Sequence, residues 1–214
     1  MAPTTVDLLL EEGTSRVFVR ALQWPGWCRT AKTPDLAIDG LLEHAPRYAL
    51  VAAKAGLTFP KAPRLEIVER VPGDSTTDFG APSAHASADG ESLQGKELYR
   101  WIALLEASWT LLDETAASSA EELQKGPRGG GRNRTKMLQH VLDAERAYAP
   151  KIGARTKPAD GSDTSAVAAN RTAIVSALKN SRGDAKWPLR YWFHRAIWHV
   201  LDHAWEMQDK QPPE

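Results

Sequence analysis

The sequence predicts a small α+β domain over residues 1–72 and an all-α four-helix bundle over residues 96–210. Three observations predict this division. Near the N-terminus, apolar and polar residues alternate as they do in half-buried strands. Beyond residue 95, apolar residues recur every three or four positions over long segments, as on one face of a helix. Between the two, residues 73–95 are rich in Gly, Ser, Ala, Asp and Pro without a helical period, which predicts a linker.

The N-terminal domain is expected to contain a small antiparallel sheet and one helix. Residues 6–12 and 16–22 flank a Gly-Thr-Ser turn and predict a hairpin, and residues 27–30 can resume the sheet after a proline. Residues 33–55 begin with a Thr-Pro pair and end before a glycine, the pattern of a single helix. Residues 64–71 alternate again and can rejoin the sheet.

Four amphipathic helices are expected in the second half, and without intervening strands they are most simply packed as a bundle. Capping residues, prolines and glycines indicate their limits. The first spans roughly residues 96–117, the second runs from Thr135 to before Pro150, the third follows Ser162 or Asp163 and ends before Gly183, and the fourth starts at Pro188.

Composition excludes several classes of protein. Lys plus Arg equals Asp plus Glu at 27 each, so there is no net field to attract nucleic acid or an anionic membrane. The one cysteine, Cys28, cannot form an internal disulfide. No apolar run is long enough to span a bilayer, and the first residues lack the pattern of a signal peptide. We therefore expect a cytoplasmic protein that binds neither membrane nor nucleic acid.

Three histidines predict a metal site. His199 and His203 lie four residues apart, so they share one helix face, and they continue the apolar stripe of the last helix. His140 lies on the predicted inner face of the second helix and can supply a third ligand. Three neutral imidazoles leave coordination positions open, which is typical of a catalytic site. They suit zinc, nickel, iron or copper. The alternative is that the pair at this spacing arose by chance.

Two glutamates on these helices could assist such a site. Glu206 follows His203 by three residues and is a candidate acceptor for a ligand N–H group or a general base. Glu145 is expected to be a solvated helix charge. The residue after His199 is not a glutamate, which disfavours zinc-protease chemistry. His194, out of phase with the pair, is expected at the surface or rim.

The glycine-rich loop before His140 is a candidate cofactor-binding segment. Arg128, Arg132 and Arg134, together with free backbone N–H groups, could bind the carboxylate or phosphate of a substrate or thiol cofactor. The competing interpretation is a flexible, solvated loop, as expected for a charged glycine-rich segment.

The segments QHVLDAERAY and RAIWHVLDHAWEMQ resemble the DinB/YfiT-like superfamily. This resemblance covers about half the chain, and it implies a four-helix bundle with a divalent metal, such as zinc, nickel or iron, on His140, His199 and His203. It also implies a metal-dependent enzyme acting on a small-molecule substrate, with transfer of a low-molecular-weight thiol such as mycothiol or bacillithiol as one known activity. Related isomerase, lyase or hydrolase steps are the others.

The N-terminal segment ALQWPGWCRTAKTPDLAIDGLLEHA is similar to the HicB-like antitoxin pattern, although Trp27 is inserted between Gly26 and Cys28. We take this likeness at the level of fold only. Two functional hypotheses follow. In the first, the protein is a metal-dependent transferase whose small domain shapes access to the site or pairs two subunits in a homodimer. In the second, it is a non-catalytic module, stabilised by the metal, whose HicB-like domain recruits a protein partner.

Overall fold

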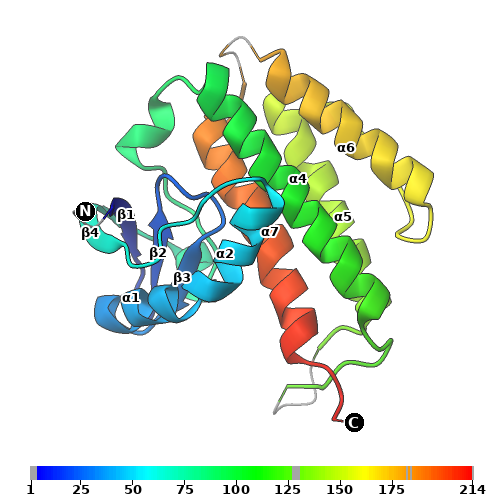
Figure 1. Cartoon of the computed structure of the whole chain (residues 1–214), viewed down its shortest axis with the longest axis horizontal. Helices are drawn as coiled ribbons and strands as arrows, with labels where there is room; N and C mark the ends of the chain where they lie inside the picture. The colour runs from blue at the N-terminus through cyan, green and yellow to red at the C-terminus, as the bar shows by residue number, and fades with distance from the viewer. Residues whose placement is uncertain (1–3, 127–130, 182, 184, 214) are drawn as a thin grey trace.

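The computed structural model describes residues 4–126, 131–181, 183 and 185–213. These residues form a mixed α/β structure, with a small sheet on one side and long helices on the other (Figure 1). The strands are β1 (Thr5–Glu12), β2 (Val17–Ala21), β3 (Cys28–Ala31) and β4 (Arg64–Pro72). The α-helices are α1 (Pro34–Glu43), α2 (Ala45–Lys54), α3 (Ser75–Phe79), α4 (Gly95–Ser118), α5 (Arg134–Tyr148), α6 (Thr164–Lys179) and α7 (Leu189–Asp209), with 3₁₀ turns η1 (Ser87–Gly90) and η2 (Ala149–Ile152).

The sheet has the strand order β3-β2-β1-β4. The β1–β2 hairpin and the β2–β3 pair are antiparallel, as expected, but β4 pairs parallel to β1. The expectation of a purely antiparallel sheet was therefore wrong. The chain leaves β3 at one edge, crosses through α1 and α2, and reaches the opposite edge, and such a helical crossover is the connection that allows parallel pairing.

The single helix expected over residues 33–55 is two helices, α1 and α2. Its beginning is confirmed, because the Thr33 side chain accepts a hydrogen bond from the Leu36 N–H and Pro34 occupies the first turn. The break falls at His44, two residues before Pro46. Proline has no N–H group and its ring clashes with the carbonyl four residues earlier, so α1 ends and α2 restarts with Pro46 in its first turn.

Residues 73–95, expected to be a linker, contain α3 and η1 and pack against strands β1 and β2. The buried Glu11 carboxylate accepts hydrogen bonds from the backbone N–H groups of Ser83 and Ala84. Buried Arg20, on the neighbouring strand β2, forms an ion pair with Asp89 of η1. Sequence patterns missed this packing because polar contacts, and not a run of apolar residues, hold the segment in place.

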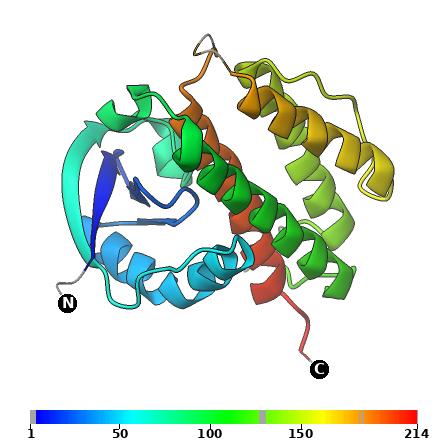
Figure 2. The same ribbon diagram turned by 45° about the horizontal axis from the view of Figure 1, so that its top comes forward.

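In the second half of the chain, α4, α5, α6 and α7 confirm the four expected helices, with limits close to those predicted. Helix α7 contacts both α4 and α5, and α6 lies on the outside (Figures 1 and 2). Because α7 lies among the other elements, thirteen of its side chains are buried, including His199 and His203. This placement turns the histidine pair away from solvent.

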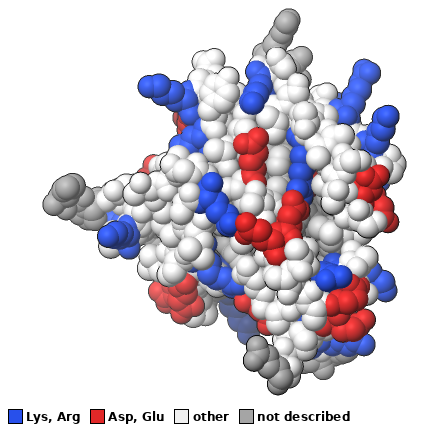
Figure 3. Space-filling model, turned by 45° about the vertical axis from the view of Figure 1, so that its right-hand side comes forward, with Lys and Arg blue, Asp and Glu red and all other residues white. Residues whose placement is uncertain are grey.

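One apolar core joins the sheet to these helices. It runs from Leu8 and Val19 through Trp27 and Tyr48 to Trp101 of α4. Charged side chains of both signs are interspersed over the face that carries α6 (Figure 3). No helix among the described residues is long and apolar enough to cross a membrane.

Candidate metal centre

The three histidines come from the two neighbouring helices α5 and α7. Helix α5 begins at Arg134 and is capped by Asn133, whose side chain accepts a hydrogen bond from the Lys136 N–H, so the cap lies two residues before the expected Thr135. His140 follows near the middle of α5. His199 and His203 lie one turn apart on α7 with 7% and 9% of their surfaces exposed, and His140 is half-buried. The predicted convergence of the three side chains is therefore present.

The geometry of the cluster suits one metal ion. One ligand nitrogen from each imidazole can be chosen so that all three lie within 4.8 Å of one another. The Nε2 atoms of His140 and His199 are 3.2 Å apart. Two nitrogens bound to one tetrahedral zinc ion would be separated by roughly 3.3 Å, because each Zn–N bond is about 2.0–2.1 Å. Little movement of these two rings is needed to bind an ion.

Electrostatics favour the neutral, ligating form of His140 and His199. Burial lowers the pKa of His199 to about 2, assisted by repulsion from His203 and His140. Burial also lowers the pKa of His140, with a further contribution from the positive charge of Arg132. Both rings are thus unprotonated at neutral pH, the state that metal binding requires. The buried Nδ1 atom of His199 has no hydrogen-bond partner among the described residues.

Glu206 contacts the third histidine directly. Its Oε2 atom lies 2.9 Å from Nδ1 of His203, and its Oε1 atom accepts a hydrogen bond of 2.5 Å from Nζ of Lys210. The hydrogen bond with His203 is the main reason why the pKa of Glu206 falls to about 2. A carboxylate on Nδ1 leaves Nε2 of His203 free to face the other two rings, as in many histidine–metal sites.

An aromatic and cationic wall lies next to His199. The rings of Trp198 and Tyr148 have centroids 5.6 Å and 6.1 Å from that of His199. Arg195 precedes His199 by one helical turn, and its Cζ atom lies 5.5 Å from the Trp198 ring and 5.8 Å from the Tyr148 ring. One side of the cluster therefore combines a positive charge with two aromatic rings.

Of the three candidate arginines of the glycine-rich loop, the two that lie among the described residues have different contacts. The positive charge of Arg132 acts on His140, whereas Arg134 points elsewhere, pairing with Glu121 at 3.0 Å and donating to the Ser119 carbonyl. Arg128 lies outside the described residues. Of the two, Arg132 is therefore the one that acts on a candidate metal ligand.

Glu145 was wrongly expected to be a solvated charge. Its carboxylate is buried and accepts a hydrogen bond of 2.6 Å from Nε1 of Trp109. Arg171 of α6 lies 4.0 Å from Glu145 and forms a two-pronged pair with Asp113 of α4. Burial raises the pKa of Glu145 to about 7, with Arg171 opposing the rise. Nothing in the sequence periodicity of α5 distinguishes this glutamate, because its partners come from α4 and α6.

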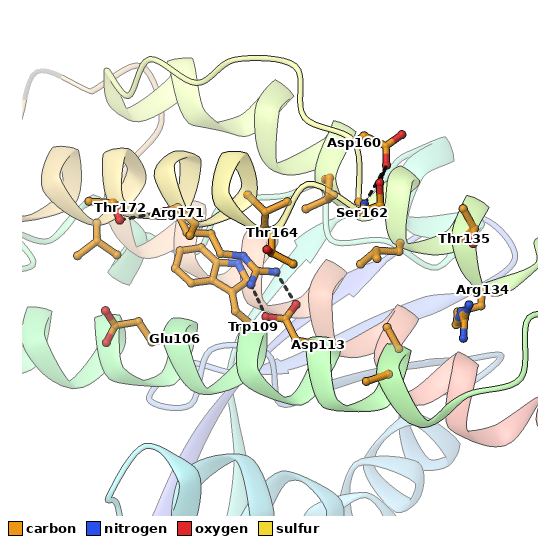
Figure 4. Close-up of a pocket in the computed structure, with 18 residues that line it drawn as sticks. Glu106, Trp109, Asp113, Arg134, Thr135, Asp160, Ser162, Thr164, Arg171 and Thr172 are labelled. Atoms are coloured by element: carbon orange, nitrogen blue, oxygen red, sulfur yellow. Dashed lines mark hydrogen bonds and ion pairs between the residues drawn. The ribbon is translucent and has the colours of Figure 1, made fainter.

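This second polar cluster adjoins a cavity of about 830 Å³ between α4, α5 and α6. Figure 4 shows the Arg171–Asp113 pair beside Trp109, where Arg171 and Asp113 come from opposite walls. Apolar side chains such as Leu138, Leu142 and Val167 line much of the remainder. The lining described for this cavity includes none of the three histidines, so the cavity and the candidate metal centre are separate features.

Two further side chains have an apolar environment. His194 is buried and packs edge-on against Trp101, contrary to the surface position expected for it. Burial holds the pKa of His194 well below its usual value, so it is a neutral core residue. Cys28 is buried beside the same core, and burial raises the pKa of its thiol, which agrees with a packing role.

Comparisons with known proteins assign no family to this chain. The chain matches no protein-family model, no curated protein and no solved structure. The resemblances to DinB/YfiT-like and HicB-like proteins are therefore still expectations, and functional inference depends on the geometry described above.

Proposed function

We propose that His140, His199 and His203 bind one divalent metal ion and that the protein is a metal-dependent enzyme acting on a small molecule. The observation that carries the proposal is the convergence of three imidazole nitrogens within 4.8 Å, contributed by two helices. Burial keeps His140 and His199 unprotonated by lowering the pKa of each, so no proton has to be displaced from them at neutral pH. Zinc, nickel and iron all suit this donor set.

Residues next to the three histidines would orient the ligands and exclude water from them. Glu206 orients the His203 ring by accepting from Nδ1, and Lys210 fixes the other carboxylate oxygen of Glu206. The flanking rings of Trp198 and Tyr148 limit the access of water to His199. Glu206 is thus a positioning residue in this proposal and not the general base.

Thiol transfer is the reaction class we favour, with a low-molecular-weight thiol as cosubstrate. The segments around His140 and His199 resemble the DinB/YfiT-like superfamily, in which such transferases occur, and this resemblance supports the choice. A bound divalent ion with an open position lowers the pKa of a thiol or water and polarises a carbonyl. Isomerase, lyase and hydrolase reactions on a small molecule use the same property.

A non-catalytic, metal-stabilised module is the second candidate, and one observation favours it. The two histidines on α7 are more than nine-tenths buried, and the 830 Å³ cavity is lined by other residues. A closed site of this kind would stabilise α5 against α7 without binding substrate. The small N-terminal domain, with its HicB-like sequence, would then recruit a protein partner.

Cobalt substitution distinguishes the two candidates. We expect the visible spectrum of the Co²⁺-loaded protein to change when a low-molecular-weight thiol is added, because an open position accepts the thiolate. The zinc-loaded protein should then consume thiol in a panel of thiols and electrophiles, and His203→Ala should lose both responses. His85→Ala, which removes an exposed histidine, is the matched control. A spectrum that no thiol alters, with metal only raising the melting temperature, would support the module instead.

A further inference from the structure

Arg195 lies on α7 close to the candidate metal centre. It lies four residues before His199, and positions four apart share one face of a helix. The Trp198 ring lies next to both residues, with its centroid 5.5 Å from Cζ of Arg195 and 5.6 Å from the His199 ring. The Arg195 side chain therefore belongs to the immediate surroundings of the candidate metal centre.

The guanidinium group of Arg195 is held in place by neutral partners. Its Nε atom donates to the Tyr148 hydroxyl at 3.3 Å, and an Nη atom donates to the carbonyl of Pro82, in the segment that packs against β1 and β2. The aromatic rings of Tyr148 and Trp198 pack against it. An arginine fixed in this way loses little further side-chain entropy when it binds a ligand.

Arg195 has no carboxylate counter-ion among the described residues, as is also true of the half-buried Arg29 and Arg100. Arg20, Arg171 and Arg190 are largely buried, and each has a carboxylate oxygen within 3 Å or less. Arg195 is half-buried and has no carboxylate within 4.0 Å among the described residues. A partly desolvated cation beside the candidate metal centre, already hydrogen-bonded on one side, is suited to bind an anion.

We propose that Arg195 binds a carboxylate group of the substrate, so that the site selects small organic carboxylates over their uncharged analogues. This inference rests on the proposed metal-dependent function. The planar guanidinium matches a carboxylate in geometry, and the Trp198 ring provides an apolar surface between Arg195 and His199. The substrate would then place its carboxylate on Arg195 and its reactive group toward the three imidazoles. Arg195 would be a specificity-determining residue.

Calorimetric titration of the zinc-loaded protein with malonate and with uncharged malonamide tests the inference. We expect wild type to bind malonate more tightly than malonamide. Arg195→Gln should weaken malonate binding by roughly tenfold or more, the value of one charge-assisted hydrogen bond, without changing malonamide binding. Arg195→Lys keeps the charge and should lose less. Arg146→Gln removes an exposed positive charge from α5 and is the matched control.

Two results would overturn the inference. One is equal malonate affinity in wild type and Arg195→Gln, which would mean that malonate binds through the metal alone. The other is an equal loss in Arg146→Gln, which would indicate a general effect of charge. Metal content is measured on every sample. A zinc-free wild type would contradict the proposed function itself, whereas a zinc-loaded protein indifferent to Arg195 would contradict only the carboxylate selectivity.

Discussion

Helix α5 contributes to two polar clusters, one made of three imidazoles and the other of carboxylates beside an arginine. Toward α7, His140 meets His199 and His203, and the facing Nε2 atoms of His140 and His199 are 3.2 Å apart. Toward α4 and α6, Glu145 accepts from Trp109, while Arg171 pairs with Asp113. The histidine cluster brings one nitrogen from each of three imidazoles within 4.8 Å of the others. In the Glu145 cluster, the pair between Arg171 and Asp113 joins α6 to α4.

This difference shows what each cluster can do. Three imidazole nitrogens that converge can bind a cation, so the histidine cluster is expected to gain stability from a bound metal. The Glu145 cluster already contains its counter-charge, and its stability should depend on pH. The two clusters can therefore be tested separately, one by metal and one by protons.

The largest expected effect concerns Glu145. Burial raises its pKa from the usual 4.5 to about 7, so the folded protein holds this proton over a pH range in which the unfolded chain has lost it. This contribution to stability is complete below pH 4.5 and decreases as pH rises toward 7. The free energy of unfolding of wild type, relative to Glu145→Gln, should fall by about 3 kcal/mol across this range. Urea denaturation of both proteins at several pH values measures it.

A chelator is added to the urea denaturation of both wild type and Glu145→Gln, so that bound metal does not contribute to either free energy of unfolding. Glu43→Gln, which alters an exposed carboxylate on α1, is the control and should leave the profile of wild type nearly unchanged. Parallel pH profiles for wild type and Glu145→Gln would show that Glu145 is ionised at all these pH values, held by Arg171.

A smaller effect is expected for Glu206. Glu206→Gln weakens the hydrogen bond that orients His203, so the dissociation constant for zinc should rise about 10- to 100-fold while one zinc ion per chain still binds at saturation. Competition with a chromophoric chelator measures this constant. Lys210→Met removes only the partner of the far carboxylate oxygen and should cost less than Glu206→Gln. Equal affinities for wild type and Glu206→Gln would contradict the positioning role.

The parts of the molecule that follow from local pattern were predictable from the sequence. The stripe that includes Trp101 and Leu105 predicted α4, and Pro188 predicted the start of α7 within one residue. The spacing of His199 and His203 placed them on one face of a buried helix, and this face is buried in the structure. These features depend on helical periodicity, which a sequence shows directly.

The parts that depend on tertiary contacts were not predictable. The parallel pairing of β4 follows from where the crossover returns the chain, and residues 73–95 are held by Glu11 and by the Arg20–Asp89 pair. Glu145 is buried because Trp109 and Arg171 reach it from other helices. The periodicity of one segment does not show which residues of another segment will contact it.

Metal content tests the central claim most directly. Wild type and His85→Ala, purified after growth with added metal, should each contain about one divalent ion per chain by elemental analysis. His140→Ala, His199→Ala and His203→Ala should each contain far less while retaining the helical circular dichroism of wild type. Stoichiometric metal in His199→Ala, or a wild type that binds no divalent ion, would contradict the assignment of these three histidines as one metal centre.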